Sequence, residues 1–532
     1  MAYYQYDSGD KNGAFENFKV GYDLNKNIIL SGYRWMTIDE RNKLTRAFRG
    51  NLDNMSHYAA ITPEDRRYAE LGYDALLFTK GLLLNSTVEL SRLLQEEGNK
   101  AASNLLNKWR KMAQEYQDLQ QKGLYDQANN LRERIDNLER ELIATSKSYG
   151  DYTDGLTVSY AEVQANLREG DIAVEFFSYK KDANSRMYGA LVLTKSQSPR
   201  YVAIGLDREW GKLIENCYAD NKLFNTLFYN LTPYFPSEQE GTIYFSADGL
   251  LHTIAIENLP GSEPYNFKRL SSTREIALNH ANDESIKHMV VIGGVKYGIG
   301  SLADLYPEEE VGDRGALNKL SYLPGTRIEA RKVCQLFAHK MNVDSLMAEK
   351  ATETNFKKLS GQRIGVLHVG THGFFHQPSD IKDPSMFESE VMKSSGLYFA
   401  GAQNTLWNEQ EHEMQDDGIL TAQEISMLDL RGLKLSVLSA CETGKGSVGP
   451  DGVFGLQRGF KQAGAEGIMM SLWKVDDQAT QILMEEFYRQ LLKGADPYAA
   501  LREAQNRVRK EYPDPKYWAA FILIDAIRKL QL

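Results

Sequence analysis

The stretch Leu433–Gly446 reads LKLSVLSACETGKG, an apolar run that stops at a cysteine and a glycine-rich turn. Its first half is partly β-branched, which predicts a buried strand, and Gly444 and Gly446 prevent that strand from continuing. Cys441 lies where the strand meets the turn. A thiol at that position can leave the core and meet a substrate, so we expect Cys441 to be a nucleophile.

A second stretch upstream has the same construction. Ile364–His372, IGVLHVGTH, predicts a strand that ends in a histidine and is followed by Gly373. From Lys287 onward, apolar strands alternate with amphipathic helices, which is typical of an α/β fold with a doubly wound parallel sheet. Ligands bind outside the carboxyl ends of such strands. We therefore expect His372 and Cys441 at the same edge of one sheet, as one active site.

Thiol chemistry follows from this pair. An adjacent imidazolium lowers the pKa of a thiol and makes it a nucleophilic thiolate. The backbone N–H groups of Gly373 and Cys441 are the expected donors to the oxyanion of an attacked amide. This chemistry implies no cofactor.

These residues allow two other interpretations. Cys441 and His372 could be a buried structural thiol and a core histidine, but their shared position at strand ends argues against this. His368, His372 and His376 are spaced by four, which on a helix would suit zinc. The surrounding glycines and valines favour strand and turn, so we expect no metal.

The substrate pocket is expected at the same edge. Ser439, two residues before the nucleophile, should line the S1 pocket. Trp473 could form a wall, and Asp476 or Asp477 could face a cationic P1 side chain. Acidic residues at a helix start are also explained by capping alone, and this alternative stays open. The acidic stretch Asn408–Gly418 either attracts a basic peptide or is a solvated loop, which we favour.

The composition sets the class of protein. The chain has 532 residues, 42% of them hydrophobic and 25% charged, so we expect a globular protein of several domains. Its net charge of −10 argues against nucleic acid as a partner. We expect no membrane span and no signal peptide. Three scattered cysteines fit a reducing cytoplasm.

The N-terminal part has a different pattern. Residues 1–36 are polar and weakly patterned, and we expect an edge strand or a loosely attached arm. Residues 37–150 carry apolar residues at helical spacing and predict a long helical hairpin that serves in packing or docks a partner. Thr37 and Glu40 have the spacing of a capping box at its start. Residues 151–285 predict a smaller α/β region, with a strand expected over Glu275–Leu278. Residues 286–532 predict the parallel sheet described above, with a polar excursion over 376–417 and a helix over 453–464.

Several motifs together resemble the CHAT peptidases (caspase HetF associated with TPRs) of the caspase and separase clan. They include VLHVGTHGFF, LSVLSACETGKG and GVFGLQRGFKQAGAEGIMMSLWKVDDQAT, with LPGTRIEARKV and YWAAFILID on either side. The resemblance implies a caspase-like α/β/α sandwich with a dyad of His372 and Cys441. It also implies a degenerate peptidase half over 151–285 and an active half over 286–532. Lys474 replaces an acidic residue of the related separase motif, which leaves arginine preference open.

These observations lead to one functional hypothesis and one rival. We expect a cytoplasmic cysteine endopeptidase, bacterial by family resemblance, that cleaves a protein substrate through a thioacyl-enzyme. The resemblance implies a regulatory protein partner or upstream sensor that switches it on. The rival is a non-catalytic caspase-like scaffold whose helices dock other proteins.

Overall fold

The computed structural model describes the chain except for residues 1, 89–99, 122, 146–155, 183, 238–239, 279–284, 299–319, 377–386, 408–415, 441–442, 445 and 450–451. The chain divides into two compact units. The first unit comprises Met1–Trp109, Arg134–His280 and Val448–Gly452, and the second comprises Arg110–Glu133, Ala281–Ser447 and Val453–Leu532. That one half is a degenerate peptidase and the other an active one stays a prediction.

The first unit begins with helices, listed in order as α1 (Ala2–Asp7), α2 (Lys11–Tyr33), α3 (Ile38–Ile61) and α4 (Arg66–Thr79). The prediction of an edge strand or loose arm over residues 1–36 is therefore wrong. Aromatic residues at helical spacing, such as Phe15, Phe18 and Tyr22, are buried and anchor α2. The start of α3 matches the predicted capping box, in which Thr37 and Glu40 bond to each other's backbone N–H.

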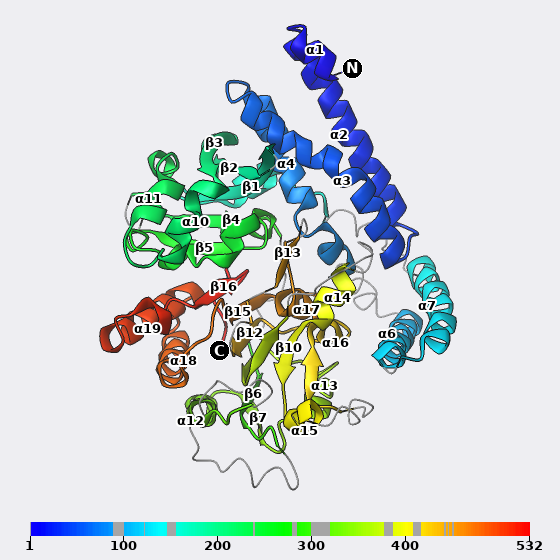
Figure 1. Ribbon diagram of the computed structural model, residues 1–532, viewed down its shortest axis with the longest axis vertical. Helices are drawn as coiled ribbons and strands as arrows, with labels where there is room; N and C mark the ends of the chain where they lie inside the picture. The colour runs from blue at the N-terminus through cyan, green and yellow to red at the C-terminus, as the bar shows by residue number, and fades with distance from the viewer. Residues whose placement is uncertain are drawn as a thin grey trace. The chain divides into compact units, whose positions relative to one another are not determined.

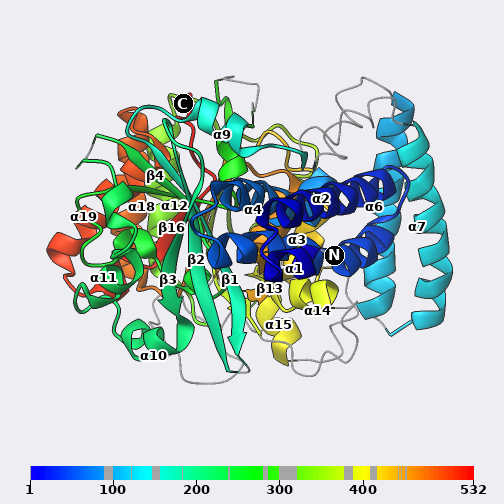
Figure 2. The same cartoon turned by 90° about the horizontal axis from the view of Figure 1, so that it is seen from above.

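Two further helices, α6 (Lys100–Gln121) and α7 (Tyr125–Thr145), correspond to the predicted helical hairpin. Figure 2 shows them running side by side. A backbone hydrogen bond of 3.0 Å from Ala128 to Leu124 opens α7 after the short turn between them. None of the helices in the described ranges is long and apolar enough to cross a membrane.

The first unit also contains a five-stranded sheet, in the order β3-β2-β1-β4-β5. The strands are β1 (Ile172–Asp182), β2 (Ser185–Thr194), β3 (Arg200–Leu206), β4 (Thr242–Ser246) and β5 (Asn266–Leu270). The strand expected over Glu275–Leu278 is instead a 3₁₀ turn, η5 (Thr273–Ile276), and β5 was not predicted. Its Arg269 is buried but lies 2.8 Å from the Glu257 carboxylate, which makes a charged sequence compatible with a strand.

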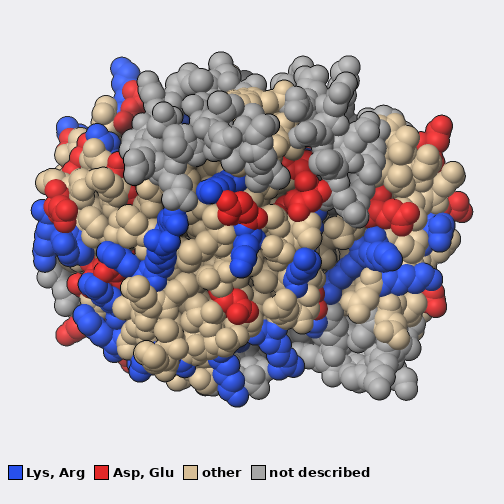
Figure 3. Space-filling view, turned by 90° about the horizontal axis from the view of Figure 1, so that it is seen from below, with Lys and Arg blue, Asp and Glu red and all other residues tan. Residues whose placement is uncertain are grey.

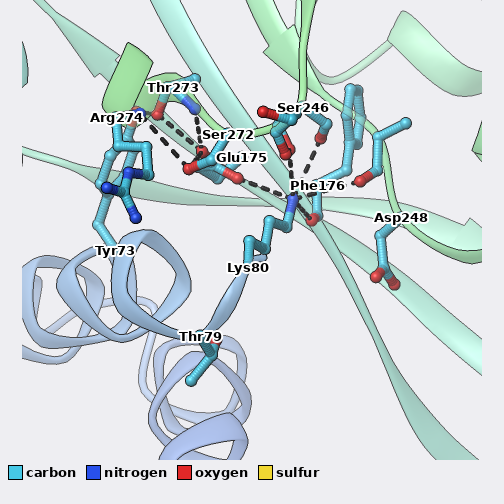
Figure 4. Close-up of polar contacts among 12 residues, drawn as sticks. Tyr73, Thr79, Lys80, Glu175, Phe176, Ser246, Asp248, Ser272, Thr273 and Arg274 are labelled. Carbon is cyan, nitrogen blue, oxygen red and sulfur yellow. Dashed lines mark hydrogen bonds and ion pairs between the residues drawn. The ribbon is translucent and has the colours of Figure 1, made fainter. Parts of the chain in front are cut away.

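A buried ion pair ties α4 to this sheet (Figure 4). Lys80, directly after α4, places its Nζ 2.7 Å from Oε2 of the fully buried Glu175 on β1. Oε1 of Glu175 accepts hydrogen bonds from the backbone and hydroxyl of Thr273 at 2.6 and 2.7 Å. The charges are therefore paired, as burial requires.

A six-stranded sheet organises the second unit, in the order β16-β15-β12-β8-β6-β7. Its strands are β6 (His288–Val295), β7 (Asn342–Ala348), β8 (Val366–Gly370), β12 (Leu435–Ser439), β15 (Gly467–Ser471) and β16 (Phe521–Ile524). All pairings are parallel except that of β15 with β16. The predicted α/β fold with a mostly parallel sheet and a preceding helical region is confirmed.

Helices lie against this sheet, which explains the apolar strand sequences. Every residue of β8 and β12 is buried. The helices are α12 (Pro324–Phe337), α13 (Glu353–Lys357), α16 (Ala422–Ser426), α17 (Leu456–Ala463), α18 (Asp477–Leu492) and α19 (Pro497–Glu511), and Figure 1 shows α18 and α19 next to each other. The helix expected over 453–464 begins later, after a short strand, β14 (Gly452–Phe454).

The stretch 376–417, expected as a polar excursion, contains regular structure. It includes α14 (Phe387–Lys393), β10 (Ser395–Tyr398) and α15 (Ala402–Trp407). β10 lies between β9 (Gly373–Phe375) and β11 (Ile419–Thr421) in a small antiparallel sheet. The buried Leu397 and Phe399 explain why this part of the excursion is ordered.

The charges on one face are mixed. Figure 3 shows Lys and Arg side chains scattered among acidic and other residues. The described residues of this face form no continuous basic surface of the kind that binds a phosphate backbone.

Candidate active site

The register of β8 and β12 relates the two predicted dyad positions. These parallel strands pair from Leu435 opposite Val366 to Ser439 opposite Gly370. His372 follows Gly370 by two residues, and Cys441 follows Ser439 by the same step. Cys441 itself, like Glu442, lies outside the described residues. The chain thus leaves two adjacent strands at the same level before each predicted dyad residue.

The residues on either side of Cys441 and Glu442 form hydrogen bonds with Ser471, the last residue of β15. The carbonyl oxygen of Ala440 accepts a hydrogen bond of 2.7 Å from the hydroxyl of Ser471. The hydroxyl oxygen of Thr443 accepts one of 3.1 Å from the Ser471 backbone, and Gly444 N–H donates to the Ser471 carbonyl at 2.8 Å. A Cβ at Gly444 would lie 3.0 Å from that carbonyl oxygen, so glycine allows this close approach.

His372 is half-buried and is held by its ring and its backbone. Its Nε2 lies 2.7 Å from the carbonyl oxygen of Ser321. Its backbone N–H donates to the hydroxyl of Tyr297 at 3.1 Å, and its carbonyl accepts from Tyr398 N–H at 2.9 Å. A carbonyl only accepts, so Nε2 carries a proton, and Nδ1 is the basic nitrogen of the neutral ring.

Tyr297 is a site residue that sequence reasoning missed. It is buried, its ring centroid lies 5.0 Å from that of His372, and its hydroxyl also contacts the Thr371 hydroxyl at 3.0 Å. Its position shortly after the carboxyl end of β6, at the same edge of the sheet, was the available signal.

Gly373 begins β9, the edge strand of the small sheet. Flanking hydrogen bonds join Tyr398 N–H to the His372 carbonyl and His376 N–H to the Ser394 carbonyl. Gly373 lies opposite Leu397. Alternation in an antiparallel ladder therefore makes this a non-hydrogen-bonded pair, and the N–H of Gly373 points away from β10.

Ser439, predicted to line the S1 pocket, is buried at the last paired position of β12. Its Oγ has no hydrogen-bond partner among the described residues. An unsatisfied buried hydroxyl costs stability, which is unusual in a core and more common at functional sites.

The other predicted pocket residues have structural contacts. Nε1 of the half-buried Trp473 donates to the Lys516 carbonyl at 3.1 Å. Asp476 is the N-cap of α18 and accepts hydrogen bonds from the backbone of Gln478 and Ala479. Asp477 accepts one of 2.6 Å from Gly325 N–H at the start of α12. The capping alternative thus describes Asp476, and Asp477 caps a different helix from its own.

The three histidines of the zinc alternative lie on strands and a turn, so helical spacing does not bring them together. His368 is fully buried on β8, with Nε2 2.8 Å from the Glu329 carboxylate and Nδ1 3.1 Å from the Tyr488 hydroxyl. His376 is exposed. Within the described ranges, no cluster of three metal-binding side chains is present.

Most of the acidic stretch, residues 408–415, lies outside the described residues. Of the remainder, Asp416 accepts a hydrogen bond from Thr354 N–H at 3.2 Å, and Asp417 accepts one from Ile419 N–H at 2.8 Å. These two carboxylates therefore organise the local backbone.

Comparison with known proteins shows which family the chain matches. Residues 220–526, more than half of the chain, match the CHAT domain family model. Tetratricopeptide repeat protein 28 of Mus musculus is 39% identical over 115 residues, which are 21% of this chain and 5% of that protein. The Homo sapiens protein of the same name is 39% identical over 114 residues, again 21% and 5%. The chain thus spans a small fraction of these relatives' length.

Similar solved structures include two complexes. The Porphyromonas gingivalis RgpB pro- and mature domains match 55% of this chain and 66% of that chain, with 11% identity and a TM-score of 0.33. The Saccharomyces cerevisiae separase–securin complex matches 97% of this chain and 48% of that chain, with 10% identity and a TM-score of 0.36.

Proposed function

The chain belongs to the CHAT domain family, and on this premise we propose that it is a cysteine endopeptidase whose dyad is Cys441 and His372. One observation carries the proposal: Gly370 and Ser439 pair at the ends of β8 and β12, and the two dyad residues follow them by equal steps. Because His372 and Cys441 each lie two residues beyond a paired position, we expect their side chains to be neighbours.

The reaction begins with a proton shift from the Cys441 thiol to Nδ1 of His372. The thiolate attacks the peptide carbonyl carbon, and the N–H groups of Gly373 and Cys441 stabilise the oxyanion. The imidazolium then protonates the leaving amine as the C–N bond breaks, which leaves a thioacyl-enzyme. His372 deprotonates a water that attacks this thioester. As the C–S bond breaks, the carboxylic acid product is released and the imidazolium returns its proton to the Cys441 thiolate. The Ser321 carbonyl keeps Nε2 protonated throughout.

Substrate recognition is part of the same proposal. Ser439 lines the pocket for the P1 side chain, with Trp473 as a wall. Asp476 and Asp477 favour a basic P1 residue, because a carboxylate that accepts backbone hydrogen bonds retains acceptor capacity for a cation. In a fluorogenic tetrapeptide panel, we expect cleavage after Arg or Lys. Robust cleavage after Asp or Leu alone would exclude this preference without excluding the dyad.

Regulation by another protein completes the proposal. The helices over residues 37–150 form the docking region for a partner or sensor that switches the peptidase on. A cytoplasmic location suits a chain whose thiol must stay reduced.

A thiol-directed peptidyl acyloxymethyl ketone tests the function. We expect it to label the wild type at Cys441, to label Cys441→Ala not at all, and to label His372→Ala slowly. N-terminal proteomics should then find new protein N-termini with the wild type and none with Cys441→Ala. Equal labelling of all three proteins, or no new N-termini, would favour the non-catalytic scaffold.

A further inference from the structure

The segment from Leu320 to Gly325 is held at both ends by side chains from other elements. At its start, Oε1 of Gln403 on α15 accepts a hydrogen bond of 2.6 Å from Leu320 N–H. At its end, Oδ2 of Asp477 on α18 accepts one of 2.6 Å from Gly325 N–H. Between these two points, Ser321 presents the carbonyl oxygen that accepts from His372.

Gln403 is fully buried and is itself tied to the histidine. Its backbone N–H donates to the carbonyl of Tyr297 at 3.0 Å. The hydroxyl of Tyr297 in turn accepts from the backbone N–H of His372. Gln403 therefore connects the segment that contacts the His372 ring with Tyr297, which contacts the His372 backbone.

Asp477 has a role that helix capping of α18 does not explain. Its neighbour Asp476 already caps that helix. The Asp477 carboxylate instead lies so close to Gly325 that a Cβ there would be 2.6 Å from its Oδ2, so the position accepts only glycine without rearrangement. Thr326 also fixes the end of this segment. Its hydroxyl accepts a hydrogen bond from Gly294 N–H at 3.0 Å and donates one to the Leu323 carbonyl at 2.7 Å.

We propose that Gln403 and Asp477 are positioning residues that fix the Leu320–Gly325 segment and thereby keep the Ser321 carbonyl on Nε2 of His372. Their effect is to hold the proton on Nε2 and the basic lone pair on Nδ1. The catalytic consequence rests on the proposed function, whereas the effect on the histidine tautomer does not.

The test is NMR spectroscopy of the full chain with ¹³C- and ¹⁵N-labelled histidine. The signal that disappears in His372→Gln is assigned to His372. We expect the wild type to show the Nε2–H tautomer at pH 8. Gln403→Leu and Asp477→Ala should shift His372 toward a mixture of tautomers. Gln403→Glu and Asp477→Asn retain an oxygen acceptor and should keep the wild-type spectrum.

Asp496→Ala is the matched control, because Asp496 caps α19 of the same unit through the backbone of Tyr498 and Ala499. It should lose stability without changing the His372 signal. If Gln403→Leu or Asp477→Ala does not fold, Gln403→Met and Asp477→Ser provide the same comparison. An unchanged tautomer in folded variants of both residues would overturn the proposal.

Kinetics separate this proposal from the proposed function. Loss of positioning in Gln403→Leu, which has no part in the P1 pocket, should lower kcat of peptide cleavage about tenfold to a hundredfold with KM little changed. A higher KM for Arg substrates with an unchanged tautomer would instead assign Asp477 to the P1 pocket and overturn its positioning role. A shifted tautomer in a chain with no peptidase activity would support the positioning role and contradict the proposed function.

Discussion

Gly370 and Ser439 lie opposite each other as the last paired residues of β8 and β12. Both are followed by short connections at the carboxyl edge of a parallel sheet, where the fold leaves room for a ligand. The hydrogen bonds of Ala440, Thr443 and Ser471 extend the order of β12 and β15 past the strands themselves. The paired ends of β8 and β12 therefore set where the connections that carry the candidate site begin.

Tyr297→Phe should weaken the site without dismantling it. The change removes the hydroxyl that accepts from His372 N–H and contacts Thr371, which leaves a half-buried N–H without that partner. We expect a loss of about 1–2 kcal/mol in the free energy of unfolding. We also expect a several-fold slower reaction with an acyloxymethyl ketone, measured by denaturant unfolding and by labelling rate.

Tyr218→Phe is the control for this prediction. The Tyr218 hydroxyl in the first unit accepts a hydrogen bond of 3.0 Å from Ala255 N–H, so its removal should cost similar stability. Its labelling rate should equal that of the wild type. Equal labelling rates for both variants would mean that Tyr297 does not position His372.

Lys80→Met should strongly destabilise the first unit. The fully buried Glu175 would lose the ammonium 2.7 Å away, which is the ion-pair partner that the described residues give it. Breaking a buried pair on one side costs about 3–5 kcal/mol, which urea unfolding would measure.

Adding Glu175→Gln to Lys80→Met should restore most of this stability. Glutamine removes the unpaired charge and still offers an oxygen to Thr273. A double variant as unstable as Lys80→Met would show that lost packing of the lysine side chain, rather than the unpaired charge, causes the effect.

Asp74→Asn should alter how stability depends on pH. Burial raises the pKa of Asp74 from 3.8 to about 6, although its carboxylate accepts a hydrogen bond from Tyr160 N–H. The folded state therefore retains a proton that the unfolded state releases between these values, so the stability from this group falls as pH rises from about 4 to 6. Asparagine keeps an acceptor for Tyr160 and does not ionise.

The variant should thus gain about 1–3 kcal/mol over the wild type at pH 7 and little at pH 4. Urea unfolding of both proteins across this range measures the difference. A constant difference between pH 4 and 7 would contradict the raised pKa.

The central strands of the six-stranded sheet were predictable because their sequences are mostly apolar runs. Parallel strands covered on both faces need such runs, as in Val366–Gly370 and Leu435–Ser439. Glycines and a histidine or cysteine at their ends then marked the site. The short strand β5 escaped prediction because Lys268 and Arg269 are charged and yet buried.

The residues that hold His372 were not predictable from local patterns. Ser321, Tyr297 and Gln403 lie in segments without hydrophobic periodicity, and each reaches the site through contacts between distant parts of the chain. The sequence pattern points to Asp477, but its contact with Gly325 depends on the packing of α12 near α18, which the sequence alone does not reveal.

The thiol pKa of Cys441 tests the central claim most directly, and its measurement requires no substrate. The rate of iodoacetamide alkylation is followed against pH by peptide mass spectrometry in the wild type and in His372→Ala. Cys217 and Cys334 serve as internal references, because burial raises the pKa of Cys217 to about 11 and also raises that of Cys334. We predict a Cys441 pKa at least about one unit below the ordinary ~8.5 in the wild type, and a return toward ~8.5 in His372→Ala. A pKa near ~8.5 in both proteins would contradict the dyad.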